Sequence, residues 1–264
     1  MKTKIISLLL CIVLLCLSLV SCTQTAHEIS GESDLVNLKI GVIESSTSDR
    51  VSQKYAETGC EILKYSSVNK LRAALESKEI TCAIIDENIA NAIIKEDNTF
   101  EIKGEPLAQD SIAFCATNDK KFYRVLFNKA LAELKESGKL DEIINGYLSD
   151  PDYKYEYVTE GEANNGTITI ALDSTLIPYV YPKDEKHEIP EGIYLALIDS
   201  LCASIGFKYS FATLTTSSLA GALRMGLADL AIGSFDLANP TSGTDTIEQT
   251  DPILSFNHII LVKK

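Results

Sequence analysis

The sequence contains few of the residues on which nucleic-acid-binding proteins, metal sites and many enzymes depend. Its 264 residues include no tryptophan and only three histidines, and 24 basic residues stand against 37 acidic ones, for a net charge of −13. A chain this acidic does not suit a nucleic acid, whose phosphates require clustered Lys and Arg. Metal-ligand spacing, a phosphate-binding loop and a nucleophile elbow are all missing from the sequence. The sequence therefore predicts no metal, no cofactor and no enzyme activity.

The cysteines lack a CxxC spacing, which argues against a redox or zinc motif. Seven are present, and three of them fall within the first 22 residues. The other four, Cys60, Cys82, Cys115 and Cys202, lie in or beside apolar runs. Export would permit disulfides, but cysteine is commonly a small buried core residue. We therefore expect four free thiols.

The first 22 residues have the layout of an export signal. Lys2 and Lys4 precede an uncharged apolar run over 5–20, and the sequence LVSC at 19–22 resembles the bacterial lipobox. This layout predicts a signal peptide over 1–21, a lipid on Cys22 and a polar tether over 22–36, which place the protein on the extracytoplasmic face of the membrane. Loss of the signal changes the net charge to −15, because two lysines leave. The alternative is an uncleaved membrane helix.

An internal repeat divides the rest of the chain. The segment LKIGVIESST at 38–47 is matched by TITIALDST at 167–175, and LRAAL followed by CAIID at 71–86 is matched by LAGAL followed by LAIGS at 219–234. Each copy alternates buried strands with an apolar helix face, the βαβ pattern of a parallel sheet. Ligands of such sheets bind beyond the carboxyl ends of the strands. These ends carry the candidate ligand-binding residues Ser45, Ser46, Thr47 and Asp86 in one copy, and Asp173 and Ser234 with Asp236 in the other.

Between the copies, apolar residues recur at helical spacing from Phe122 to Leu134 and again from Leu140 to Tyr147, with Gly138 as the break. The polar segment 151–166 predicts a connecting loop. A further amphipathic helix runs from Ile193 to Ile205 and ends at Gly206.

These motifs together resemble the type II solute-binding proteins that deliver amino acids to ABC importers. The segments that carry the resemblance are ALDSTLIPYVY at 171–181, EGIYLAL at 191–197, IGF at 205–207, KIGVIESST at 39–47 and AIID at 83–86, with the helix pair around Gly138. The resemblance implies a two-lobed α/β fold with a ligand cleft between the lobes. It also implies a membrane permease as partner.

The order of the segments departs from the family, because the part that matches the family's second lobe comes first. We therefore expect a circular permutation, with 37–106 as the family's second lobe, 107–150 as an inter-lobe crossover and helices of the first lobe, and 167–264 as the first lobe. A single crossover around 107–115 would then join the lobes. We expect a monomer, and a lobe-swapped dimer is the alternative.

The resemblance also implies ligand contacts, and here the chain is atypical. The family commonly holds a ligand carboxylate with an arginine, but the corresponding stretch, 231–244, contains none. Asp86 and Asp173 match the family's acidic positions and are our candidates for binding an ammonium group, and Tyr179 and Tyr181 are candidates for the cleft wall. The missing arginine and the additional Asp236 favour a cationic or neutral ligand. Two alternatives remain: a ligand-sensing or partner-binding lipoprotein that does not serve transport, and a dehydratase-like enzyme.

Overall fold

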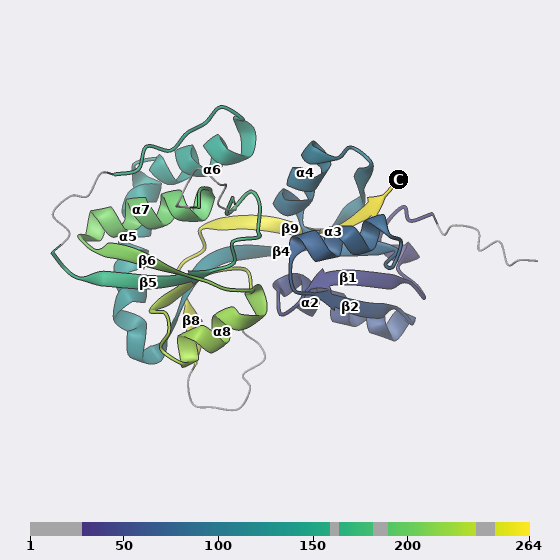
Figure 1. Cartoon of the computed structure of the whole chain (residues 1–264), viewed down its shortest axis with the longest axis horizontal. Helices are drawn as coiled ribbons and strands as arrows, with labels where there is room; N and C mark the ends of the chain where they lie inside the picture. The colour runs from purple at the N-terminus through teal and green to yellow at the C-terminus, as the bar shows by residue number, and fades with distance from the viewer. Residues whose placement is uncertain (1–27, 159–163, 182–189, 236–245) are drawn as a thin grey trace, which may run out of the picture.

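Two α/β lobes are joined by a pair of long strands in the computed structural model (Figure 1). It describes residues 28–158, 164–181, 190–235 and 246–264. The strands form one continuous sheet in the order β2-β1-β3-β9-β4-β7-β5-β6, and β8 pairs with β4. The predicted fold class, α/β with two lobes, is confirmed.

The amino-terminal lobe is built on three parallel strands, each a short apolar run that ends in a polar loop. It consists of β1 (Lys39–Ile43), β2 (Glu61–Tyr65) and β3 (Cys82–Asp86), with α2 (Thr47–Ser52), α3 (Val68–Glu76), α4 (Glu87–Glu96) and the 3-10 helices η1 (Glu32–Asp34) and η2 (Gln53–Thr58). All five residues of β3 are buried, as expected for a strand with neighbours on both sides.

The carboxy-terminal lobe repeats this plan and adds a helix pair. It consists of β5 (Thr167–Leu172), β6 (Lys208–Thr213), β7 (Leu230–Gly233) and β8 (Ile247–Gln249), with η3 (Asn118–Lys120), α5 (Lys121–Glu136), α6 (Lys139–Ser149), α7 (Ile193–Ile205) and α8 (Thr216–Arg224). Gly138 separates α5 from α6 with φ 74°, and Gly206 caps α7 with φ 70°. Both glycines adopt the left-handed region that favours this residue, and both helix breaks lie where the sequence predicts them.

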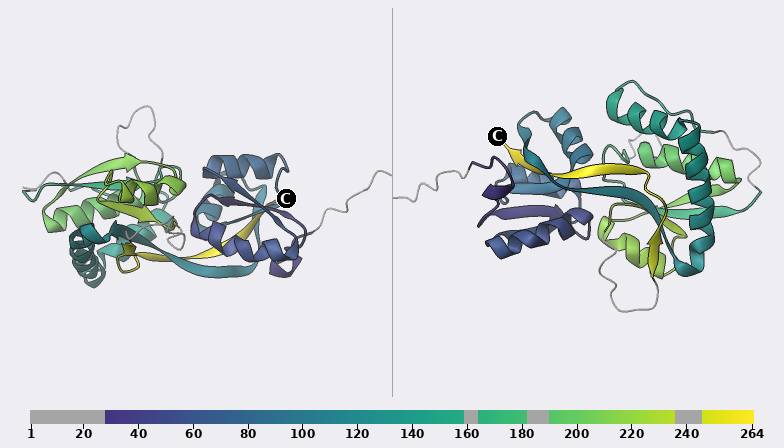
Figure 2. Two further views of the ribbon diagram at one scale, coloured as in Figure 1. Left: turned by 90° about the horizontal axis from the view of Figure 1, so that it is seen from below. Right: turned by 180° about the vertical axis from the view of Figure 1, so that it is seen from behind.

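Two strands, rather than the predicted one, cross between the lobes. β4 (Phe100–Thr117) and β9 (Leu254–Lys263) run antiparallel to each other along the hinge, as Figures 1 and 2 show. β9 begins beside the carboxy-terminal part of β4 and ends beside β3. The expectation of a single crossover is therefore wrong, and the last residues of the chain lie in the amino-terminal lobe although the sequence places the whole of 167–264 in the other lobe. An apolar strand that changes lobes has the same local pattern as one that does not.

The end of the predicted tether is part of the amino-terminal lobe. Ile29 and Leu35 are buried, and they pack in a cluster with Ile40, Val42 and Ile260. The tether over 22–36 is therefore shorter than the sequence predicts, because Ile29 and Leu35 pack against strands β1 and β9. Cys22 lies outside the described residues.

All four remaining cysteines are buried free thiols, as predicted. Burial raises the pKa of Cys82, Cys115 and Cys202 to about 12, so these thiols stay protonated and unreactive at neutral pH. Within the described part of the chain, no helix has the length and apolar character needed to cross a membrane.

Candidate functional site

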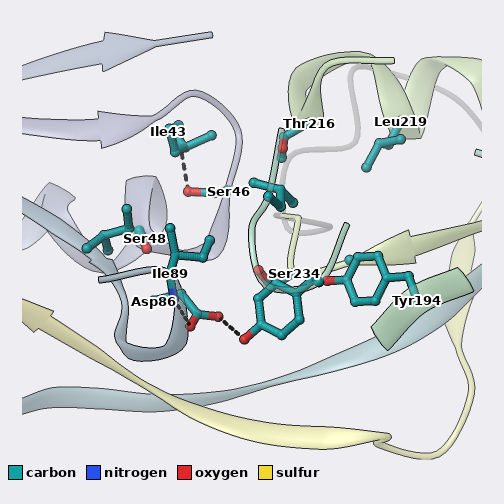
Figure 3. Close-up of a pocket in the computed structure, with 13 residues that line it drawn as sticks. Ile43, Ser46, Ser48, Asp86, Ile89, Tyr194, Thr216, Leu219 and Ser234 are labelled. Carbon is teal, nitrogen blue, oxygen red and sulfur yellow. Dashed lines mark hydrogen bonds between the residues drawn. The ribbon is translucent and has the colours of Figure 1, made fainter. Parts of the chain in front are cut away.

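Residues at or just beyond the carboxyl ends of β1, β3 and β7, with residues of the loop after β5, line a pocket between the lobes, part of which Figure 3 labels. The hydroxyl-bearing residues Ser46, Ser48, Thr216 and Ser234 contribute to its lining, together with the acidic residue Asp86. Its other lining residues are mainly apolar or aromatic: Ile43, Ile85, Ile89, Leu176, Tyr179, Tyr194, Leu219 and Gly233. Residues from the two halves of the sequence repeat thus meet at one site, as expected for strand ends in open α/β sheets.

The two carboxylate oxygens of Asp86 have different hydrogen-bond partners. Oδ1 caps helix α4 by accepting the backbone N–H of Asn88 at 2.7 Å and that of Ile89 at 3.4 Å. Oδ2 accepts the hydroxyl of Tyr179, which comes from the other lobe, at 2.7 Å. One oxygen therefore stabilises the fold, and the other makes a bond that spans the cleft.

Burial governs the ionisation of this pair. It raises the pKa of Asp86 to about 7, although the hydrogen bonds from Tyr179, Asn88 and Ile89 lower it. Burial and the charge of Asp86 raise the pKa of Tyr179 well above its ordinary value. The tyrosine hydroxyl therefore keeps its proton and acts as the donor, whereas the carboxyl changes its charge near neutral pH.

Tyr179 is held from both lobes. Its ring stacks on that of Tyr194 in α7, with the centroids 5.1 Å apart and the planes 13° from parallel. Its hydroxyl also accepts Asn88 Nδ2 at 2.9 Å. Only 1% of the residue is exposed. The predicted wall residue is thus the side chain that closes the cleft.

Asp173 has a different environment from Asp86. Its Oδ1 accepts the backbone N–H and the hydroxyl of Thr175, at 2.9 and 2.7 Å. Its Oδ2 accepts the same two groups of Thr216, at 2.9 and 2.8 Å. All four donors lie in its own lobe, and the side chain does not line the pocket. Asp173 joins the end of β5 to the start of α8.

Of the other predicted residues, some line the pocket and some do not. Ser46 and Ser234 line it, and Thr47 N–H donates to the Ser234 carbonyl across the cleft at 3.0 Å. Ser45 and Tyr181 do not line it; Tyr181 instead forms an isolated β-bridge with Glu191.

The remaining predicted residue, Asp236, lies outside the described residues. A second inter-lobe contact is the antiparallel bridge between Ser46 and Phe235. With the bonds of Tyr179, these contacts hold the lobes together.

A polar network at the hinge escaped the sequence analysis. His258 of β9 is fully buried, and its Nδ1 lies 2.9 Å from Ser48 Oγ, while its Nε2 lies 3.7 Å from Asp110 Oδ2 of β4. Arg50 Nη2 donates to the same Asp110 oxygen at 2.7 Å. Burial alone would raise the pKa of Asp110, but the His258 ring, Ser111 N–H and the charge of Arg50 together lower it. This network joins both hinge strands to α2 and, through Ser48, to the pocket.

Sequence reasoning also missed Ser48, Tyr194 and Thr216 as pocket residues. Tyr194 has the pattern of an ordinary core residue in α7, and Thr216 that of a helix start. Ser48 had a usable signal, because it continues the hydroxyl-rich run that begins at Ser45.

The pocket has a distinct electrostatic character. Among the described residues that line it, one carries a carboxylate and none carries a basic side chain. The described residues also hold no cluster of His, Cys, Asp and Glu suited to a metal ion. The arrangement can bind a small polar molecule through one carboxylate oxygen and several hydroxyls.

Comparisons with known proteins found likeness only in structure. No family model and no curated protein matches the chain. A ligand-binding component of an ABC-type import system from Staphylococcus aureus is 12% identical over 86% of this chain and 65% of its own length, with a TM-score of 0.46.

Two further solved structures resemble this chain to a similar degree. A pheromone precursor lipoprotein of the YaeC family from Enterococcus faecalis is 14% identical, covers 86% of this chain and 85% of its own, and has a TM-score of 0.42. The GluR0 ligand-binding core from Nostoc punctiforme, in complex with glutamate, is 10% identical over 86% and 85% of the two chains, with a TM-score of 0.39.

Proposed function

We propose that this protein is an extracytoplasmic solute-binding protein that captures a small polar ligand by closure of its two lobes. The observation that carries the proposal is Asp86, a buried carboxylate at the inter-lobe pocket with one oxygen whose partner, among the described residues, comes from the opposite lobe. A ligand between the lobes can take over that bond, because opening of the hinge separates Asp86 from Tyr179.

Lobe closure follows from the way the lobes are connected. β4 and β9 are the continuous strands between them, and paired strands can bend or twist while each lobe keeps its own core. The inter-lobe contacts include the polar bonds of Tyr179 and Thr47, and apolar side chains of both lobes line the pocket around them. A ligand that bridges both lobes would shift the equilibrium towards the closed form.

A thermal-shift screen of small polar metabolites, followed by small-angle scattering, tests the proposal. A ligand that binds only the folded state raises its melting temperature, and we expect the radius of gyration of a partly open population to decrease on binding. Saturating binding with an unchanged radius of gyration at every pH tested would contradict capture by closure.

We propose further that Cys22 carries the lipid anchor and that an ABC permease receives the ligand from a monomeric protein. The lipobox-like LVSC sequence supports the anchor. Labelling with a fatty acid in the wild type and in Cys22→Ala tests it, because only the wild type should take up label. Light scattering tests the monomer, and a strict dimer would favour the lobe-swapped arrangement.

We propose also that the order of the lobes is permuted. Helices α5 and α6, which resemble the family's final helix pair, follow the first crossing strand here and pack on α7 of the carboxy-terminal lobe. A rejoined chain with 167–264 placed before 37–150 should fold to a monomer with the same affinity for a ligand found in the screen. Failure of that chain to fold, while the natural order folds, would argue against the permutation.

One observation favours the second candidate, a partner-binding lipoprotein. The inter-lobe bonds of Tyr179, Thr47 and Ser46 join the lobes through the protein's own groups. If no solute in the screen binds to the wild type or to a Tyr179 variant, we infer that the closed form is the one that binds a partner.

A further inference from the structure

We propose that the ligand is a small organic amine without a carboxylate, and that the hydroxyl of Tyr179 is its built-in competitor for Asp86. This inference rests on the proposed solute-binding function and narrows it to one chemical class. In the closed structure the phenol occupies the position that the ligand ammonium would take at Asp86 Oδ2.

The first step is to identify which carboxylate can exchange its partner. Asp173 accepts four hydrogen bonds from its own lobe and does not line the pocket. Asp86 Oδ1 caps α4, so a ligand that displaced its donors would unwind the start of a helix. Among the carboxylate oxygens of Asp86 and Asp173, Asp86 Oδ2 is the one whose described partner belongs to the opposite lobe and leaves when the lobes part.

The second step concerns the charge of the ligand. A ligand carboxylate buried in this pocket would need a basic partner, because an unpaired buried charge is strongly disfavoured. No basic side chain is present among the described lining residues. An ammonium group, in contrast, is matched by Asp86, and its remaining donors can be satisfied by the serine and threonine hydroxyls nearby. A single positive charge therefore fits the site, and a zwitterion does not.

The third step concerns space. With Tyr179 in place the pocket encloses a cavity of about 20 Å³, which suits a single water molecule. A ligand of more than one or two heavy atoms therefore needs the Tyr179 hydroxyl to leave Asp86. Because Tyr179 and Asp86 belong to different lobes, opening of the hinge breaks that bond and frees the carboxylate.

The competition has a defined direction. An ammonium bound to a carboxylate forms a charge-assisted bond with a full charge on both partners, which is stronger than the bond from a neutral phenol. The amine should therefore displace the hydroxyl, but with an affinity reduced by the competition. The carboxyl also loses its proton near pH 7 because burial raises the pKa of Asp86, so binding should strengthen as the pH rises from 6 to 8.

Three probes of similar size test the ligand class by calorimetry on the mature, lipid-free protein. Ethanolamine carries an amine and a hydroxyl, glycine carries an amine and a carboxylate, and ethylene glycol carries hydroxyls only. We expect ethanolamine to bind at least roughly tenfold more tightly than glycine or ethylene glycol, a difference of about 1.4 kcal/mol. Glycine binding as tightly as ethanolamine would overturn the inference.

Two variants test the role of the hydroxyl and the carboxylate. Tyr179→Phe keeps the ring and removes the competitor, so the affinity for ethanolamine should rise roughly tenfold or more. Asp86→Asn keeps a helix-capping side chain and removes the charge, so ethanolamine binding should be lost. Tyr153→Phe is the matched control, since this tyrosine lies outside the pocket, and its affinity should equal that of the wild type.

The outcomes separate this inference from the proposed function. Tight binding of glycine or another carboxylate ligand, with lobe closure, would keep the solute-binding function and reject the amine. No binding by any solute in either the wild type or Tyr179→Phe would reject both. An ethanolamine affinity that Tyr179→Phe leaves unchanged would reject the competitor role even if the amine binds.

Discussion

Asp86 and Asp173 stand at strand ends of the two lobes, and both are almost fully buried, yet their surroundings differ. Asp173 receives all of its hydrogen bonds from Thr175 and Thr216 within one lobe. Asp86 divides its bonds between its own helix and a tyrosine of the opposite lobe. The difference teaches that a buried carboxylate becomes a candidate ligand site only when one of its partners can leave without unfolding the chain.

The surroundings of Asp86 also explain its shifted acidity. Burial raises the pKa of Asp86 to about 7 because its few donors only partly offset the loss of solvent. A group of this kind gives the cleft a charge that depends on pH, whereas the role of Asp173 is to fix the start of α8.

The largest expected effect comes from removal of the structural carboxylate. Asp173→Ala leaves four donors of Thr175 and Thr216 without their acceptor, and unsatisfied buried donors are costly. We expect the free energy of unfolding at pH 7 to fall by about 4 kcal/mol, measured by urea titration. A loss below about 1 kcal/mol would mean that water replaces the carboxylate and that Asp173 is as exchangeable as Asp86.

The second prediction concerns the pH dependence of stability. Between pH 4 and 7 the folded state keeps a proton on Asp86 that the unfolded state has lost, so the contribution of Asp86 makes stability fall as the pH rises through that range. The free energy of unfolding of the wild type relative to Asp86→Asn should therefore fall by roughly 3 kcal/mol from pH 4 to 7. Parallel pH profiles of the two proteins would show that the acidity of Asp86 is not shifted.

A smaller effect is expected from loss of the inter-lobe hydrogen bond between Tyr179 and Asp86. Tyr179→Phe removes the hydroxyl that links Asp86 and Asn88 to the other lobe. We expect the free energy of unfolding to fall by about 2 kcal/mol, because a hydrogen bond to a charged group is lost. The radius of gyration of the ligand-free protein should increase at the same time. A stability loss without any change in that radius would mean that other contacts keep the lobes closed.

The smallest effect should follow from loss of one donor to Asp173. Thr216→Val removes a hydroxyl but keeps the backbone N–H that also bonds to Oδ2. We expect a loss of about 1 kcal/mol in the free energy of unfolding, measured by urea titration. A loss as large as that of Asp173→Ala would contradict the sharing of the carboxylate among four donors.

Much of the fold could be predicted from local patterns. The strands around Ile40 and Ala83, the two helix breaks at Gly138 and Gly206, and the burial of the cysteines all depend on short-range apolar spacing. The second crossing strand, β9, could not be predicted, because an apolar run does not specify which sheet it will join. The buried end of the tether was missed for a similar reason, since Ile29 and Leu35 are isolated apolar residues in a polar segment.

The candidate site was predictable only in part. The repeat pointed to the strand ends and hence to Asp86 and Ser234, because parallel strands bring their carboxyl ends together. It could not tell Asp86 from Asp173, since the donors that distinguish them lie 93 and 43 residues away. The family resemblance led us to expect Tyr179 in the cleft wall rather than in contact with the Asp86 carboxylate. Nothing in the sequence indicated that His258 joins the hinge to Ser48.

The central claim is that Asp86 exchanges a neutral partner for a charged one, and proton release on binding measures it most directly. Calorimetric titration of ethanolamine at pH 6, in buffers of different ionisation enthalpy, counts the protons that leave the protein. Because Asp86 is mostly protonated at that pH, the account predicts the release of close to one proton per ligand, which declines towards zero by pH 8.5. Binding at pH 6 without proton release would contradict it.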